Sequence, residues 1–158
     1  MKVQDVMTSN VKACRPETNL AAAATVMWEE DIGVLPVVTD EGKVVGMITD
    51  RDIAIAVGTR GCPAAGIAVS EVITGKVYSG HLHDDIHSAL KTMRHWKARR
   101  LPVVNDDGLL QGILCLNDLV LRAEEKKGGR APELSYEDAM STMKAICEHR
   151  PLTAAAQA

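Results

Sequence analysis

The chain has 158 residues, of which 46% are hydrophobic and 3% aromatic, and its 18 basic and 21 acidic side chains give a net charge of −3. This length can bury a core without a metal or disulfide, while the weak negative charge and the scarcity of aromatic rings argue against nucleic-acid binding. Because no stretch reads as a secretory signal or as a membrane span, we expect a cytoplasmic protein that binds neither nucleic acid nor a membrane.

The first long element predicted in chain order is a helix that starts near residue 20. Four apolar residues at positions i, i+3, i+4 and i+7 form the buried stripe typical of an amphipathic helix. Thr18 is of a residue type that caps helix N-termini, and we expect it to cap this one. The stripe consists of Leu20, Ala23, Ala24 and Met27.

A hairpin and a second helix are expected next. Residues 34–38 and 44–49 are rich in β-branched side chains and flank a turn that contains Gly42. This pattern is typical of two antiparallel strands joined by a short turn. The second helix is expected near residues 50–57, and a short strand is expected before the first helix.

The same order of elements returns 66 residues later. A gapless comparison of residues 3–56 with residues 69–122 gives 14 identities in 54 positions, which indicates an internal repeat. Asp84 is the expected cap of the repeated first helix. We therefore divide the chain into unit 1, residues 1–57, a connector, residues 58–68, and unit 2, residues 69–125.

The repeat predicts the fold class. A unit of about 55 residues buries too little of its surface to be stable alone, so the two units are expected to pack against each other by their sheets. The prediction is an α/β protein of two tandem β-α-β-β-α units with pseudo-two-fold symmetry and a C-terminal helix. Equivalent clefts are expected where the units meet.

Residues 126–158 are predicted to hold a linker, a helix at about 135–149 and a disordered tail. Ser135 and Asp138 have the spacing of a capping box at the start of this helix. Its apolar stripe is expected to pack on the domain or on a second subunit. The predicted stripe consists of Ala139, Met140, Met143, Ile146 and Cys147.

The segment 46–52 carries the clearest chemical signal, because it lies where a strand passes into a helix. Gly46 permits close approach of a ligand, and the free amides of a helix start attract an anion. Thr49 can donate to a phosphate and Asp52 can accept from the two hydroxyls of a ribose. The alternative is purely structural, because Thr and Asp are also ordinary helix-capping residues. The recurrence of Gly112 and Asp118 at the same spacing favours a nucleotide site.

With these motifs the sequence resembles the cystathionine β-synthase (CBS) domain family, as a stand-alone tandem pair spanning residues 2 to about 125. The resemblance implies that Asp52 binds ribose, that Thr49 binds phosphate, and that other residues line the base pocket. It also implies homodimers that regulate a partner. Taken with the residues singled out from the repeat, the predicted nucleotide-binding residues are Thr8, Asn10, Val11, Gly33, Val34, Leu35, Pro36, Gly46, Thr49, Arg51, Asp52, Arg99, Arg100, Pro102, Gly112 and Asp118.

Unit 2 departs from the family pattern. Cys115 stands where unit 1 has Thr49, and a thiol is a weak hydrogen-bond donor. Phosphate binding is expected to be poorer there unless Arg99 or Arg100 compensates, while Asp118 still permits ribose binding. We therefore expect two unequal sites, of which the one in unit 1 is the better.

The predicted function is a non-enzymatic regulatory module without catalytic residues, a metal or an obligatory cofactor. It would bind AMP, ADP or ATP, with S-adenosylmethionine or NAD as further candidates, and act as a homodimer on an unknown effector protein. One alternative is a structural or protein-interaction dimer with no nucleotide. A second is a redox- or metal-responsive module that uses Cys14, Cys62, Cys115 or the pair His81 and His83; an enzyme ranks last.

Overall fold

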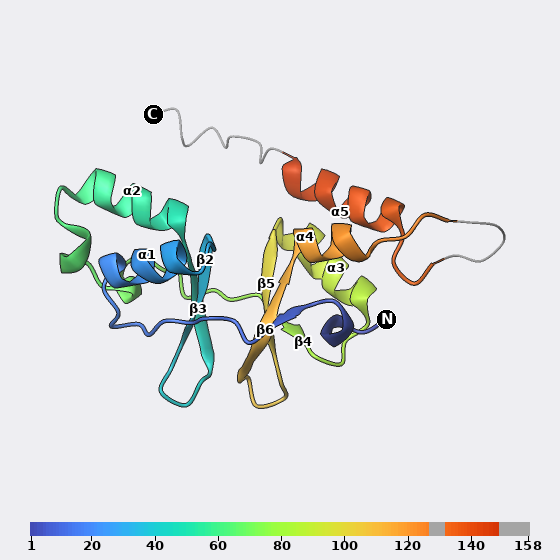
Figure 1. The fold of residues 1–158 in the computed structure, drawn as a ribbon, viewed down its shortest axis with the longest axis horizontal. Coiled ribbons are helices and arrows are strands. Elements are labelled where there is room, and N and C mark those ends of the chain that lie inside the picture. Colours follow the sequence, from blue (N-terminus) through green and yellow to red (C-terminus); the bar gives the residue numbers. More distant parts are fainter. Residues whose placement is uncertain (127–131, 149–158) are drawn as a thin grey trace.

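The computed structural model describes residues 1–126 and 132–148 (Figure 1). The strands are β1 (Thr8–Ser9), β2 (Val34–Val38), β3 (Val44–Thr49), β4 (Gly80–His81), β5 (Arg100–Val104) and β6 (Leu110–Cys115). The helices are α1 (Leu20–Glu29), α2 (Asp50–Arg60), α3 (Ile86–Trp96), α4 (Leu116–Arg122) and α5 (Tyr136–Cys147), with short 3-10 turns at Val3–Asp5, Ala64–Gly66 and Val69–Glu71. None of the helices in these described residues is long and apolar enough to cross a membrane.

The predicted fold class is confirmed, including the tandem repeat and the C-terminal helix. The β2–β3 and β5–β6 hairpins begin and end at positions 66 residues apart, and each has a bulge at the same place. The two hairpins stand side by side and meet at their turns (Figure 1). There the amide of Val44 donates to the Gly108 carbonyl at 3.3 Å, and the amide of Leu110 donates to the Gly42 carbonyl at 3.1 Å.

The predicted caps of the first helix in each unit are wrong by one residue. Asn19 caps α1, where its side chain accepts from the Ala22 amide, and Asp85 caps α3. The predicted residues instead close the turns that precede the helices. Thr18 accepts from the Arg15 amide at 3.0 Å, and Asp84 accepts from the His81 amide at 3.1 Å.

The apolar core of each unit includes residues from the segment that begins the other unit, together with Ile67 of the connector in unit 1. Val3 and Val6 pack in the apolar cluster of unit 2, while Ile67 and Val69 pack in that of unit 1. Backbone hydrogen bonds hold both crossings: the amide of Leu20 donates to the Ile67 carbonyl at 2.9 Å. The two apolar clusters are therefore separate, but each is completed by chain from the opposite unit.

The sheets of the two units differ. Unit 2 has a four-stranded sheet in the order β1-β6-β5-β4, in which β1 comes from the N-terminal segment, whereas unit 1 has only β2 and β3. The counterpart of β4 in unit 1 is a single bridge between Cys14 and Val37. Within the described residues no strand is added to β3 as β1 is added to β6, and this asymmetry shapes the clefts described below.

The predicted capping box of α5 is confirmed. The Asp138 carboxylate accepts from the backbone amide of Ser135 at 3.0 Å and from its hydroxyl at 2.6 Å. Burial disfavours the charged form of Asp138, yet these hydrogen bonds and the neighbouring His87 together lower its pKa. His149 and residues 153–158, which bear the predicted helix end and tail, lie outside the described residues.

The predicted apolar stripe of α5 is partly wrong. The buried residues are Ala139, Thr142 and Ile146, whereas Met140 and Met143 are exposed. The helix packs on both α3 and α4. Its buried face therefore includes Thr142 and lies to one side of the predicted stripe. Burial of that hydroxyl is compatible with an apolar contact because it donates to the Asp138 carbonyl at 2.8 Å.

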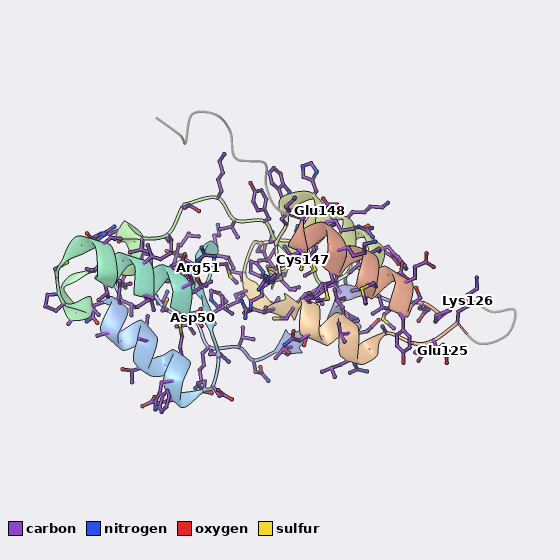
Figure 2. All side chains as sticks on the ribbon, turned by 90° about the horizontal axis from the view of Figure 1, so that it is seen from above. Asp50, Arg51, Glu125, Lys126, Cys147 and Glu148 are labelled. Carbon is purple, nitrogen blue, oxygen red and sulfur yellow. The ribbon has the colours of Figure 1, made fainter. Side chains whose placement is uncertain are left out.

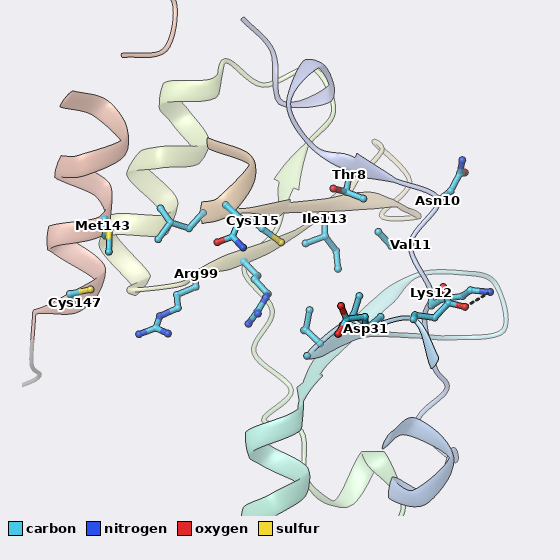
Figure 3. A pocket seen from close by; sticks show the side chains of 17 residues that line it. Thr8, Asn10, Val11, Lys12, Asp31, Arg99, Ile113, Cys115, Met143 and Cys147 are labelled. Atoms are coloured by element: carbon cyan, nitrogen blue, oxygen red, sulfur yellow. Dashed lines mark ion pairs between the residues drawn. The ribbon is translucent and has the colours of Figure 1, made fainter. Parts of the chain in front are cut away.

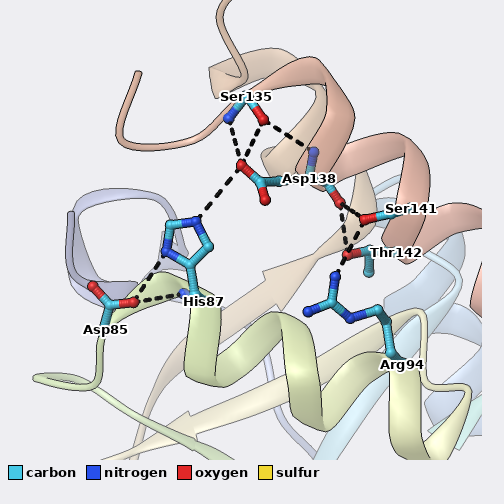
Figure 4. Close-up of polar contacts among 7 residues, drawn as sticks. All are labelled: Asp85, His87, Arg94, Ser135, Asp138, Ser141 and Thr142. Atoms are coloured by element: carbon cyan, nitrogen blue, oxygen red, sulfur yellow. Dashed lines mark hydrogen bonds and ion pairs between the residues drawn. The ribbon is translucent and has the colours of Figure 1, made fainter. Parts of the chain in front are cut away.

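Polar contacts fix α5 along α3 (Figure 4). His87 lies between two carboxylates, with Nδ1 3.1 Å from Asp85 and Nε2 3.6 Å from Asp138. About two turns toward the C-terminus of α3, the Arg94 guanidinium donates to the Ser141 hydroxyl at 3.2 Å. The two helices therefore run in the same direction, with several contacts along their length.

Candidate ligand-binding cleft between the two units

A cavity of about 620 Å³ lies between the two units. Its walls come from β1 and the residues after it, from the loop between α1 and β2, from the start of β5, from the β6–α4 junction and from one side of α5 (Figure 3). This size is typical of a small-molecule site. The cleft therefore requires both units and the C-terminal helix to be in place.

The structure divides the predicted site residues into two groups. Seven of them line the cavity together with Cys115: Thr8, Asn10, Val11, Gly33, Val34, Arg99 and Arg100. Nine do not line it: Leu35, Pro36, Gly46, Thr49, Arg51, Asp52, Pro102, Gly112 and Asp118. Leu35, Pro36 and Pro102 are buried within the hairpin strands.

This grouping differs from the sequence-based expectation, which placed residues 8–11 and 33–36 beside Thr49 and Asp52. The N-terminal segment crosses to unit 2 and pairs with β6, with Thr8 opposite Ile113. It therefore meets the helix start of unit 2 rather than that of its own unit. The cavity of about 620 Å³ is therefore the one that ends at Cys115.

Asp118 stands directly behind this cleft. One of its oxygens accepts from the Cys115 amide at 2.7 Å, and the other accepts from the Thr8 hydroxyl at 3.4 Å. The second bond is long for a contact between two oxygens. One carboxylate oxygen is thus held rigidly while the other can accept a better donor.

Gly112 permits the close approach of β1. A Cβ atom at this position would collide with the backbone carbonyl of Thr8 and would touch the Met7 sulfur. The corresponding Gly46 faces the side chain of Ile73 instead. A larger residue at position 112 would therefore displace strand β1, whereas a larger residue at position 46 would displace only the Ile73 side chain.

Thr49 and Asp52 satisfy each other in a capping box at the start of α2. The Asp52 carboxylate accepts from the Thr49 amide at 2.9 Å and from its hydroxyl at 2.7 Å. The Thr49 hydroxyl in turn accepts from the Asp52 amide at 3.2 Å. Neither residue, nor Arg51 between them, lines the cavity of about 620 Å³.

A family profile for the CBS domain matches residues 3–58 and again residues 69–125. The chain belongs to the CBS domain family. The CBS domain-containing protein YhcV of Bacillus subtilis is 33% identical over 138 residues, which are 86% of this chain and 96% of YhcV. Hypoxic response protein 1 of Mycobacterium tuberculosis is 31% identical over 77% of this chain and 85% of its own length.

Solved structures of CBS proteins have the same fold. The crystal structure of hypoxic response protein I, which holds two coordinated zinc ions, matches with a TM-score of 0.71 and 30% identity over 78% of this chain and all of that one. The structure of CBSX2 in complex with AMP matches with a TM-score of 0.64 and 27% identity, and the match covers 76% of this chain and 93% of that one. The CBS domain pair of MJ0100, in complex with 5-methylthioadenosine and S-adenosyl-L-methionine, matches with a TM-score of 0.69 and 25% identity. This match covers 77% of this chain and 94% of that one.

Sequence reasoning missed several residues of the CBS cleft. Lys12, Glu30 and Asp31 line it from unit 1, and Lys12 pairs with Glu30 at 3.2 Å. Met143 and Cys147 line it from α5, on the face that the predicted stripe had assigned to packing. No local pattern marks these residues, because only the docking of α5 and the exchange between units bring them to the cleft.

The cleft combines cationic and neutral groups. Arg99 and Arg100 are exposed at its unit 2 side, where they can bind an anion. Burial, followed by the negative charge of Asp118, raises the pKa of the Cys115 thiol to about 11, although Arg100 acts in the opposite direction. Cys115 is therefore a neutral thiol near neutral pH.

No metal-binding cluster of three or more His, Cys, Asp or Glu side chains is present within residues 1–126 and 132–148. His81 and His83 are exposed, and the His81 amide is bonded to Asp84.

Cys14 and Cys115 are expected to resist thiol reagents. Burial raises the pKa of Cys14 to about 11 as well, so at pH 8 each is labelled roughly 100-fold more slowly than a thiol of ordinary pKa. Cys147 is exposed and Cys62 partly so, and both are expected to react first. Peptide mass spectrometry after timed maleimide labelling measures this, with urea-unfolded protein as the control; labelling of Cys115 as fast as Cys147 would contradict it.

Proposed function

We propose that this protein is a regulatory module that binds an adenosine nucleotide in the cleft between its two CBS units. The observation that carries the proposal is that Asp118, fixed by the Cys115 amide at 2.7 Å, lies directly behind a cleft that Arg99 and Arg100 line. A carboxylate suits the hydroxyls of a ribose and guanidinium groups suit a phosphate. AMP and S-adenosyl-L-methionine in related CBS structures support an adenosine ligand.

The cleft offers three kinds of contact to such a ligand. Val11, Val34 and Ile113 provide an apolar region for the base. Asp118 would exchange its 3.4 Å bond from Thr8 for a ribose hydroxyl. Arg99 and Arg100 would hold the phosphate and take the role that Cys115, as a weak donor, cannot fill.

Asp52 and Thr49 are proposed to bind a second ligand more weakly. Both bonds from Thr49 reach the same Asp52 oxygen, so the other oxygen could still accept from a ribose, but the Thr49 hydroxyl would have to break its 2.7 Å bond before it could donate to a phosphate. This reverses the expected order of the two sites.

Binding would act by population shift. The cleft is built from both units and α5, so a ligand stabilises the arrangement in which these three parts meet. An effector protein that distinguishes this arrangement from others would then read the nucleotide level. Regulation without catalysis is part of the proposal.

A thermal-shift panel tests the proposal. AMP, ADP, ATP, NAD and S-adenosylmethionine are each added to the wild-type chain, with GMP and inorganic phosphate as controls. A ligand at about 100 times its Kd stabilises the native state by about 2.7 kcal/mol, which raises Tm by roughly 5–10 °C for a chain of this length. Absence of any shift with all five adenosine compounds would reject the nucleotide function.

The alternative of an interaction dimer has one observation in its favour. Leu121 is 83% exposed on α4, and Tyr136 and Met140 are 59% and 57% exposed on α5. Large apolar side chains on neighbouring helices are typical of surfaces that a second subunit covers. We propose that a homodimer forms on this side, and this contact is compatible with a filled or an empty cleft.

A further inference from the structure

The C-terminal helix α5 forms one wall of the proposed nucleotide cleft, although it lies outside the residues that match the CBS profile. Met143 and Cys147 line the cavity from this helix, whereas the profile ends at residue 125. Figure 2 shows α5 over unit 2, with Cys147 and Glu148 at the end that is directed toward unit 1. What this wall contributes to ligand binding is therefore a property of this chain and not of the two repeated units.

The two ends of the cleft differ in charge. At the unit 1 end Lys12 is paired with Glu30 at 3.2 Å, and Asp31, the next residue, also lines the cavity. This end therefore carries more negative than positive charge. At the unit 2 end stand Arg99 and Arg100, and neither has an ion-pair partner within residues 1–126 and 132–148. A nucleotide is therefore expected to place its phosphate at the unit 2 end.

The phosphate end of the cleft is the end that α5 bounds. Figure 3 shows Met143, Cys147 and Arg99 together on one side of the cleft. Neither of the two α5 side chains suits a further phosphate, because a thioether has no hydrogen-bond donor and a thiol is a weak one. Lys144 is the one cation within α5, and it does not line the cavity.

The C-terminal end of α5 also carries negative charge. The last carbonyls of a helix have no partner within the helix and bear partial negative charge, and Cys147, the last residue of α5, lines the cleft. The Lys97 ammonium is already engaged there, since it donates to the Glu148 carbonyl at 2.9 Å and lies 3.8 Å from the Glu148 carboxylate. Phosphates beyond the first would approach this helix end and be repelled by it.

Contacts along its whole length hold α5 in place. Three of its side chains are buried as it packs on α3 and α4. Near its start Asp138 lies 3.6 Å from His87, and in its middle the Ser141 hydroxyl accepts from Arg94 at 3.2 Å. Lys97 holds its end. A longer ligand must therefore fit past this wall, because moving the wall would break these contacts.

We propose that the C-terminal end of α5 selects the 5′ substituent of the nucleotide and favours adenosine ligands with one phosphate over those with two or three. This selectivity rests on the proposed nucleotide function of the same cleft. AMP is expected to bind between about 5- and 30-fold more tightly than ATP, the range for a charge placed favourably or unfavourably at a helix end. Met143 is the residue through which the selectivity can be changed, because its side chain lines the cleft and is 43% exposed.

Calorimetric titrations of AMP, ADP and ATP into the full chain test this proposal, with EDTA present so that no magnesium neutralises the phosphates. Met143→Lys places an ammonium group on the wall and is expected to tighten ATP binding at least about fivefold, while AMP binding changes little. Met140→Lys is the matched control, because Met140 is also exposed on α5 but does not line the cavity. Any effect of this control on a dimer changes both affinities and cancels in their ratio.

Maleimide labelling checks independently that the ligand lies against α5. AMP at about 100 times its Kd is expected to slow the labelling of Cys147 at least about tenfold, and to leave unchanged that of Cys62, which does not line the cavity. Unchanged labelling of Cys147 in the AMP complex would overturn the proposal.

The titrations separate this proposal from the nucleotide function on which it rests. If the wild type binds ATP as tightly as AMP, or if the ratio of the two affinities is unchanged by Met143→Lys or changed equally by Met140→Lys, the selectivity is wrong and the nucleotide function stands. If none of the three nucleotides binds, the nucleotide function itself is rejected, and the selectivity with it.

Discussion

Asp118→Asn is expected to weaken AMP binding roughly 10- to 150-fold, because it replaces a charged acceptor by a neutral amide in a partly buried site. The carboxylate of Asp118 has one oxygen bound to the Cys115 amide and the other only to Thr8 at 3.4 Å. The second oxygen is the proposed ribose acceptor. Isothermal titration of AMP into wild type and variant measures the change.

Asp52→Asn is the matched control for this prediction. Asp52 and Asp118 occupy the same position in the capping boxes of α2 and α4, so both substitutions weaken a helix start by a similar amount. A difference in AMP affinity between them therefore reports on the ligand and not on folding. A large loss in Asp52→Asn with none in Asp118→Asn would move the principal site to the other cleft.

The secondary structure could be predicted because its signals are local. The two hairpins follow from β-branched runs around Gly42 and Gly108, whose φ angles of 83° and 79° are those that glycine adopts most readily. The capping box at Ser135 similarly needs only four residues. These features depend only on residues that are close in the sequence. The pattern that predicts a hairpin also occurs twice, at positions 66 residues apart.

The composition of the cleft could not be predicted from such signals. It depends on the N-terminal segment crossing to unit 2, where Val3 is buried and Thr8 pairs with Ile113. The pattern of valines around Val3 is the same whether the segment packs on its own unit or on the other. The sequence therefore predicts Thr8 beside the start of α2, whereas the structure places it beside Asp118 at the start of α4.

Gly112→Ala is expected to destabilise the protein by about 1–3 kcal/mol, the usual cost of overpacking, and to abolish AMP binding. The new methyl group would collide with the Thr8 carbonyl and press on the Met7 sulfur, so β1 would have to leave β6. Loss of β1 removes Thr8 from the cleft and exposes the junction through which Val3 and Val6 reach the core. Urea unfolding and AMP titration measure the two effects.

Gly46→Ala introduces the same atom at the equivalent position of unit 1, and there the stability change is expected to stay below about 1 kcal/mol. Its new methyl group meets the end of the Ile73 side chain, which can rotate away, whereas a backbone carbonyl held in a strand cannot. AMP affinity is expected to remain near that of the wild type. Equal losses of stability and AMP affinity in both variants would contradict a special role of β1 in the cleft, because each glycine would then matter only for the hairpin that contains it.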